Sequence, residues 1–179
     1  MVEEPFEPAN VYLVGFHVGA SSASADFYTL VLLHDGSVPG QDRPLTRDGA
    51  ILWFSKPETA VTALEVGDES FREARLNLGE VAIVYDLAEA VSLTAHGGRD
   101  ENGTIVDCLN ILIDMVKATG FPMPSAYLKT LSEFADHTTF SKDIGAFFTD
   151  PRHDRIAVLD ALTWAVGAIT LNSAIFSTE

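Results

Sequence analysis

Three short stretches of the chain hold residue types that could bind or transform a ligand. The first is Asp42-Arg-Pro-Leu-Thr-Arg-Asp48, inside a segment from 35 to 49 that is dense in Gly and Pro. That density predicts a loop, and loops of this length often carry function. Arg43 and Arg47 could grip a carboxylate or a phosphate. The alternative is a pair of surface ion pairs with the neighbouring acids, which would contribute little to stability.

The second stretch is His96-Gly-Gly-Arg-Asp-Glu-Asn-Gly103. Glycines beside His96 and Arg99 could expose backbone N–H groups to an anion. Part of the stretch is similar to a calcium loop, but its glycine comes too early and no Glu stands at the closing position. The alternative is a helix C-cap followed by a polar turn, and the Gly-Gly and Asn-Gly pairs favour it.

The third stretch, Asp150-Pro-Arg-His-Asp-Arg155, precedes a long apolar run. His153 could act there as a general base or help to bind an anion. The alternative is a helix start, with Asp150 as the cap, Pro151 in the first turn and Asp154 favoured by the helix dipole. Capping accounts for nearly every residue, so it is the favoured interpretation.

No linear motif points to a cofactor or a metal. The chain has no phosphate-binding loop, dinucleotide fingerprint, nucleophile elbow, H-E-x-x-H or C-x-x-C sequence. Its five histidines form no i, i+4 pair, so no metal site and no cofactor is expected. The single cysteine, Cys108, excludes an internal disulfide and falls on the apolar part of a predicted helix, where it would be an inert core residue.

The elements that must position these residues divide at about residue 86. Apolar, β-branched runs predict strands at Val11–Val18, Phe27–His34, Ile51–Phe54 and Val81–Tyr85. The first two would form a hairpin with a long loop, and the second is apolar enough to be covered on both faces. A helix should begin at Ser55 as its cap and end near Gly67, and a short helix should follow over 69–77.

The second half is predicted to be helical. Asp86 should cap a helix that runs to Leu93 and ends at the Gly97-Gly98 pair. Further helices are expected over Thr104–Ala118 and Ser125–Ala135. In Thr104–Ala118, polar residues spaced 3, 4 and 3 apart form one stripe on an otherwise buried helix.

The last segment, Ile156–Phe176, has a single charge, Asp160, and is long enough to span a bilayer. A central acid costs about 2.5–3.5 kcal/mol on insertion scales, so a buried helix is favoured over a membrane span. Its stripe of Asp160, Thr163, Gly167 and Thr170 suits a central helix that its neighbours approach closely.

Together these elements predict an α+β fold. A mainly antiparallel N-terminal sheet of about four strands should pack against a C-terminal helical half with a central, apolar last helix. At 179 residues the chain is expected to be one domain, with a loose tail at 1–10, a strand-rich part at 11–86 and a helical part at 87–179.

The charge of the chain disfavours some classes of binding partner. A formal net charge of −15 with no Lys/Arg cluster disfavours nucleic acid and anionic membranes. The N-terminus lacks a signal peptide, and the lone cysteine fits a reducing compartment, so the expected location is the cytoplasm. Between Glu65 and Asp114 the acids outnumber the bases by eight. This is either a solvated face or a patch that meets a basic protein.

Two functions are therefore open. The first is a non-enzymatic protein–protein interaction module, such as an adaptor, a chaperone-like factor or an immunity-type inhibitor of a basic protein. The alternative is a small-molecule binder or enzyme whose pocket lies between the 35–49 loop and the 96–103 turn, with Arg43, Arg47, His96 and Arg99 as its ligand-binding residues. A homodimer is a third expectation, because the last helix is very apolar.

Overall fold

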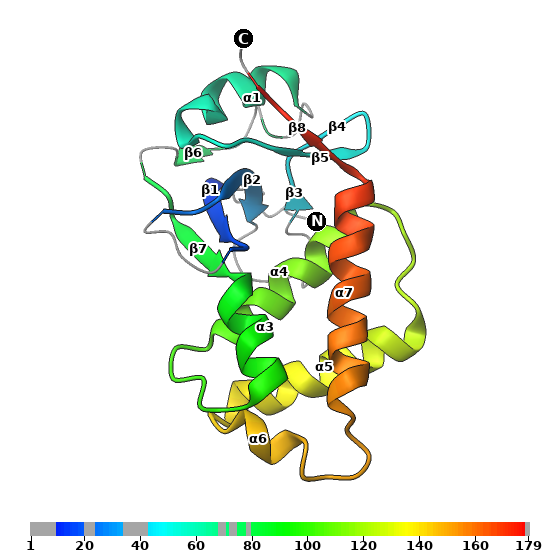
Figure 1. The fold of residues 1–179 in the computed structure, drawn as a ribbon. Helices are drawn as coiled ribbons and strands as arrows, with labels where there is room; N and C mark the ends of the chain where they lie inside the picture. The colour runs from blue at the N-terminus through cyan, green and yellow to red at the C-terminus, as the bar shows by residue number, and fades with distance from the viewer. Residues whose placement is uncertain are drawn as a thin grey trace, which may run out of the picture.

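The protein has the predicted α+β architecture, with strands in its first half and helices in its second (Figure 1). The structure, a computed structural model, describes residues 10–19, 24–33, 43–67, 71, 75–77 and 80–177. The predicted tail at 1–10, apart from Asn10, and residues 35–42 of the predicted loop lie outside these residues.

The larger sheet is built around β1 (Asn10–His17). Strand β2 (Phe27–Leu33) lies antiparallel to it, with Asn10 opposite Leu33 and Phe16 opposite Phe27, so the predicted hairpin is confirmed. Strand β3 (Arg43–Pro44) pairs antiparallel with β2. On the other side of β1, β6 (Arg75–Asn77) and β7 (Ile83–Asp86) both run parallel to it. The sheet is therefore mixed.

A second, smaller sheet joins residues 46–53 to the C-terminal end of the described chain. Strand β5 (Ala50–Trp53) pairs with β4 (Thr46–Arg47) through the two-residue Asp48-Gly49 turn. Both turn residues have positive φ, 53° and 80°, as a tight hairpin requires. On its other side β5 pairs in parallel with β8 (Ser173–Ile175). The prediction that these last residues continue the final helix is wrong.

The helices are η1 (Pro57–Thr59), α1 (Ala60–Val66), α3 (Leu87–His96), α4 (Thr104–Ala118), α5 (Ser125–Phe140), α6 (Ile144–Phe147) and α7 (Arg155–Leu171). The helices at 60–66, 87–96 and 104–118 end close to their predicted positions, whereas α5 runs five residues past the predicted Ala135 and the short α6 was not predicted. The Asp86 cap is confirmed, since its carboxylate accepts from the Glu89 N–H at 2.8 Å. The helix expected over 69–77 is wrong at its end, where 75–77 form β6.

Two predicted caps are also wrong. Ser55 lies ahead of η1, whose N-cap position is Lys56 and has no side-chain cap. At α7 the cap is Asp154, whose carboxylate accepts from the Ile156 N–H at 2.9 Å. Residues 150–153 form a turn, so the helix begins four residues later than predicted. The carboxylate of Asp150 is bonded instead to Arg152.

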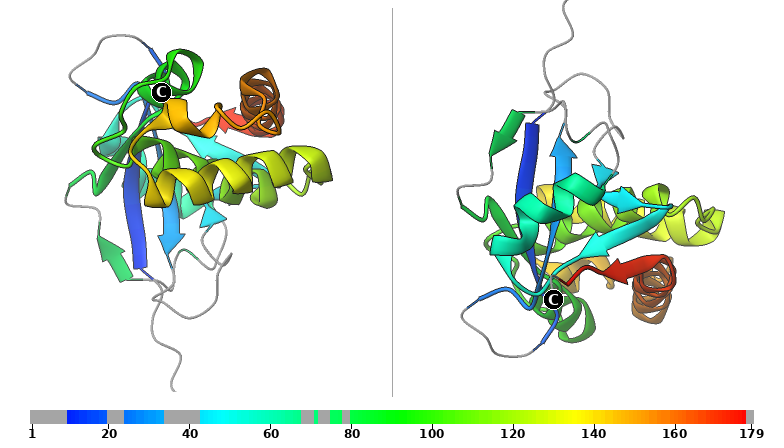
Figure 2. Two further views of the ribbon diagram at one scale, coloured as in Figure 1. Left: turned by 90° about the horizontal axis from the view of Figure 1, so that it is seen from below. Right: turned by 90° about the horizontal axis from the view of Figure 1, so that it is seen from above.

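The core has two parts, one on each face of the larger sheet. Val11, Leu13 and Leu30 pack with α1 and β5, while Val14 and Phe16 pack with the helical half. Figure 1 shows α1 above the sheet and α4 below it. Figure 2 looks along this axis, so α5 and α6 lie in front of the sheet in its left view and α1 lies in front of it in its right view. Both faces of β1 and β2 are covered, as the apolar composition of β2 predicts.

The last helix packs against α3, α4 and α5 along one side only. Its stripe of Asp160, Thr163, Gly167 and Thr170 is solvent-exposed, and a Cβ on Gly167 would meet nothing within 4 Å. The close approach expected at this stripe is therefore wrong. Among the described residues, no helix is long and apolar enough to cross a membrane.

Candidate functional site

An apolar groove runs between α3 and α7, with α4 as its floor. It consists of a narrow part of about 210 Å³ and a wide part of about 340 Å³, which adjoin at the shared lining residues Leu87, Leu112 and Val166. We call it the α3–α7 groove. In Figure 1 its two wall helices stand on either side of α4.

Each part of the groove is lined by a different set of elements. The narrow part lies between the helices alone, with Ala90 and Val91 of α3, Ile105 and Cys108 of α4, and Leu159 and Leu162 of α7 in its lining. The wide part adds the ends of both sheets, with Phe16, Val18, Phe27, Trp53, Ser173 and Ile175. The groove thus reaches from the helical half to the small sheet.

Arg155 ties the two walls together at the narrow end. Its Nη1 donates to the carbonyl oxygens of Thr94 at 3.0 Å and Ala95 at 2.8 Å, in the last turn of α3. Its guanidinium also lies over the Phe148 ring, 4.3 Å from the centroid. A cation at a helix C-terminus satisfies carbonyls that have no partner within the helix. The separation of α3 and α7 is therefore fixed at this end.

The wide end is held by aromatic contacts. The Phe16 ring meets Trp53 edge-on, with the centroids 5.0 Å apart, and stacks with Tyr85 at 5.2 Å. The Trp53 Nε1–H donates to the Ser173 hydroxyl at 2.9 Å. This bond joins β5 to β8 across 120 positions of sequence. The rim of the wide part is therefore built from segments that no local sequence signal connects.

The hydroxyl groups in the groove are bonded within the protein. Thr94, Thr163 and Thr170 each donate to the carbonyl oxygen four residues earlier, all at 2.8 Å. Ser173 donates in the same way to Ile169 at 2.6 Å. These hydroxyls have no free proton to donate, so the surface of the groove is mainly apolar.

Among the described residues that line the two parts of the groove, Cys108 is the one with a titratable side chain. Burial raises the pKa of its thiol to about 12, and the negative charges of Asp86 and Asp107 add to this. Such a thiol stays protonated at neutral pH and is a poor nucleophile. The groove therefore offers binding surface and no evident acid–base or nucleophilic group.

Three acidic residues are sequence neighbours of residues that line the groove. Asp26 and Asp86 directly precede the lining residues Phe27 and Leu87, and Asp160 directly follows Leu159. The Asp26 carboxylate accepts from the Val18 N–H at 2.9 Å and the Gly19 N–H at 3.1 Å. These two bonds lower the pKa of Asp26 and keep it anionic.

The two arginines of the predicted 43–47 site lie in the strand half. Arg43, on β3, places its guanidinium 5.9 Å from the centre of the Phe71 ring. Arg47, on β4, forms an exposed ion pair with Asp48 at 3.7 Å. Neither residue lines the α3–α7 groove. A ligand at these arginines remains a prediction.

His96 and Arg99 lie near the opposite end of the molecule, beside α6. The His96 ring is 3.0 Å from the Ser92 carbonyl, and the Arg99 Nε donates to Glu101 at 2.6 Å. Figure 1 places β3 and β4 at the sheet end and α6 at the far end of the helical half. The four predicted ligand-binding residues are therefore not brought together.

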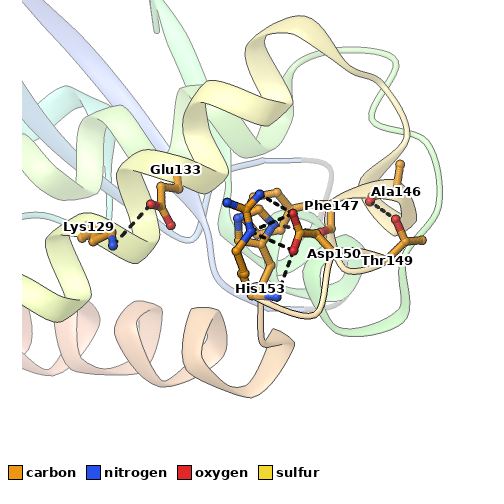
Figure 3. Close-up of polar contacts among 8 residues, drawn as sticks. Lys129, Glu133, Ala146, Phe147, Thr149, Asp150 and His153 are labelled. Atoms are coloured by element: carbon orange, nitrogen blue, oxygen red, sulfur yellow. Dashed lines mark hydrogen bonds and ion pairs between the residues drawn. The ribbon is translucent and has the colours of Figure 1, made fainter.

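The 150–155 segment is a compact turn beside α5 (Figure 3). The Asp150 carboxylate accepts from the Arg152 backbone N–H and from its Nε, both at 3.0 Å, and these bonds lower the pKa of Asp150. His153 stacks on Phe147 with the ring centroids 3.9 Å apart. Asp150 and Arg152 are paired with each other, so the segment is a turn ahead of α7. Asp154 rather than Asp150 caps that helix, and Pro151 lies outside it.

The acidic residues of the 100–103 turn also have a structural role. Asp100 is 3% exposed, and its two carboxylate oxygens accept from the Thr104 and Ile105 N–H groups at 2.9 and 2.8 Å. This holds the N-terminus of α4. No three His, Cys, Asp or Glu residues of the described chain lie close enough to hold a metal ion.

No protein-family model, curated protein or solved structure matches this chain. The site must therefore be interpreted from its own chemistry. Sequence reasoning missed the α3–α7 groove, although one signal was present. Leu87, Ala90, Val91 and Thr94 follow the 0, 3, 4, 7 spacing of a single helix face.

Proposed function

We propose that the protein is a non-enzymatic binding protein whose α3–α7 groove receives an apolar, positively charged segment of a partner protein. The observation that carries this proposal is the chemistry of the groove lining. It is apolar, its hydroxyl groups donate within the protein, and its one titratable group is a buried thiol.

Exposed apolar side chains on both walls support the proposal. Val91 of α3 is 45% exposed and Val166 of α7 is 44% exposed, and both line the groove. Covering them would remove apolar surface from water at about 25 cal/mol per Å². Large apolar patches rimmed by polar residues commonly mark interaction sites.

Charge determines which apolar segment would bind. The whole chain carries −15, and the negative charge of Asp86 acts on Cys108 of the groove lining. Lysine or arginine residues beside the apolar residues of the partner would speed its association, and the rate would fall as salt is added. An acidic segment of equal hydrophobicity would be repelled.

The test uses Trp53 as an internal reporter. The chain has two tryptophans, and Trp164 faces Tyr127 rather than the groove lining. In a Trp164→Phe variant, the emission of Trp53 therefore reports on the wide part. Two lysine-flanked apolar peptides, one patterned as a strand and one as a helix, are titrated into this variant in turn. At least one should give a saturable change, weaker at higher salt, that glutamate-flanked versions do not give.

Matched charge substitutions identify the binding surface. Val91→Glu places a carboxylate in the groove, whereas Val61→Glu places one on α1, where Val61 is 59% exposed. Val91→Glu should abolish the response and Val61→Glu should preserve it. Equal binding by the two variants, or no saturable response from any lysine-flanked peptide, would contradict the proposal.

A further inference from the structure

We infer that the partner segment binds as an added β-strand along the free edge of β8, with alternate apolar side chains entering the wide part of the α3–α7 groove. This inference rests on the proposed function and names the form that the bound segment takes. It makes the small sheet, rather than a helical wall, the primary docking element.

The hydrogen bonds of β8 show which backbone groups face outward. The Asn172 carbonyl accepts from the Ile51 N–H at 2.8 Å, and the Phe176 N–H donates to the Trp53 carbonyl at 2.6 Å. Between them Ala174 lies opposite Leu52 of β5. In a parallel ladder alternate residues bond to the same neighbour, so the N–H and C=O groups of Ser173 and Ile175 point away from β5.

The three residues of this outward edge include no lysine and no proline. In the described sheet, β8 is the end strand of the order β4-β5-β8. Edge strands are commonly protected by a lysine, a proline or a bulge. The sequence of β8 is Ser-Ala-Ile, and Ile175 is 72% exposed. An incoming strand would therefore meet neither a charge nor a steric block on β8.

The side chains of β8 show where the added strand would place its own. Ser173 and Ile175 both line the wide part of the groove, on the same face as Trp53. Residues directly opposite each other in neighbouring strands point to the same face of a sheet. The two partner residues opposite Ser173 and Ile175 would therefore point into the hollow formed by Phe16, Met115, Val166 and Ile169.

The shape of the groove favours a strand over a helix. An α-helix with its side chains is about 10–12 Å wide and needs a trough of that width along its length. Here Arg155 bonds the two walls together at the narrow end. The larger volume, about 340 Å³, lies beside β8. That volume can hold a few side chains of a partner strand whose backbone is paired with the edge of the sheet.

Backbone N-methylation of the strand-patterned peptide tests the pairing directly. Two peptides of the same sequence are made, one methylated at its odd residues and the other at its even residues. Only one set of N–H groups would face β8. The peptide methylated on that set should bind the Trp164→Phe protein at least about fivefold more weakly than the unmethylated peptide, and the other methylated peptide should bind with about the same affinity as the unmethylated one. Equal affinities for the two would overturn the pairing.

A pair of protein variants tests the same edge from the other side. Ile175→Pro removes an N–H that points away from β5 and so leaves the β5–β8 ladder intact. Ile175→Ala keeps that N–H and removes most of the side chain. We expect Ile175→Pro to lower the affinity for the unmethylated peptide at least about fivefold, and to lower it more than Ile175→Ala does.

The outcomes separate this inference from the proposed function. If no lysine-flanked peptide binds the protein with native Ile175, the proposed function fails. If the helix-patterned peptide binds more tightly than the strand-patterned one, and Ile175→Pro leaves its affinity unchanged, the groove is a binding site but the strand pairing is wrong. If Ile175→Pro does not fold, the two methylated peptides still decide the question.

Discussion

Arg155, the first residue of α7, donates to the carbonyl oxygen of Thr94 at the end of α3, with 3.0 Å between Nη1 and the oxygen. A second bond from the same nitrogen reaches Ala95 at 2.8 Å. One side chain thus satisfies the C-terminus of α3 and fixes the start of α7 against it. Because the two helices are the walls of the α3–α7 groove, this contact sets the width of the groove at its narrow end.

Replacing Arg155 by Ala should destabilise the fold. The change removes two charge-assisted hydrogen bonds, leaves partly buried carbonyls without a partner and removes the stacking on Phe148. We expect the free energy of unfolding in urea to fall by about 2–4 kcal/mol. Arg152→Ala is the matched control, since Arg152 is exposed and bonds to Asp150 in its own turn. Equal effects of the two changes would contradict the assigned role of Arg155.

Asp100 should be the acid of the 96–103 turn on which the fold depends most. Its carboxylate caps the first turn of α4 through the Thr104 and Ile105 N–H groups and is nearly inaccessible to solvent. Asp100→Ala should lower the free energy of unfolding by about 1–3 kcal/mol. Asp107→Ala, an exposed acid in the same first turn, should change it little. If Asp107→Ala cost as much as Asp100→Ala, the loss would reflect the charge near the helix and not the cap.

Local signals predicted most of the elements and few of their contacts. The caps of α3 and the bounds of α4 follow from residues within one turn of the helix ends, so Asp86 and Thr104–Ala118 were predicted correctly. The Asp48-Gly49 turn also carries a local signal, yet it was included in a long loop. The wrong caps at Ser55 and Asp150 show that several residues near a helix start can compete for the same role.

The candidate site depended on pairings that the sequence does not encode locally. The wide part of the groove requires β8 beside β5 and the bond from Trp53 to Ser173, which joins residues 120 positions apart. Nothing near Ser173 indicates a strand, because it follows an apolar helix directly. Arg43, Arg47, His96 and Arg99 were chosen for their charge, whereas the groove is formed by residues whose type suggested only a core.

Asp26 should make stability depend on pH in the acid range. The Val18 and Gly19 N–H groups, and to a lesser extent His17, lower its pKa in the folded protein. The unfolded chain binds this proton first as pH falls, near pH 4, so the stabilisation is present above that pH and is lost as pH falls through the lower folded pKa. The difference in unfolding free energy between native protein and Asp26→Asn should therefore shrink from pH 6 toward pH 2. Asp48→Asn, at a fully exposed turn, is the control.

Cys108 should be nearly unreactive in the folded protein. With its pKa raised to about 12, only about one molecule in 10⁴ carries the thiolate at pH 8, and the thiol is also 2% exposed. A water-soluble disulfide reagent should label the native protein at least a hundredfold more slowly than the chain in urea, because the thiolate is the nucleophile. Rapid labelling without urea would show that the narrow part of the groove opens to solvent and that its thiol is not held protonated.

The same shift predicts how Cys108 affects stability in alkali. The unfolded thiol loses its proton near pH 8.5, whereas the folded thiol keeps it to about pH 12, so the folded state binds the extra proton between these values. The free energy of unfolding should then fall as pH rises from about 9, by up to about 1.4 kcal/mol per pH unit from this group. Tyrosines and lysines titrate in the same range, so the measurement is the difference between native protein and Cys108→Ala across pH 8 to 11. The native protein should lose stability more steeply than the variant, and parallel curves would mean that the thiol ionises as easily in the groove as in water.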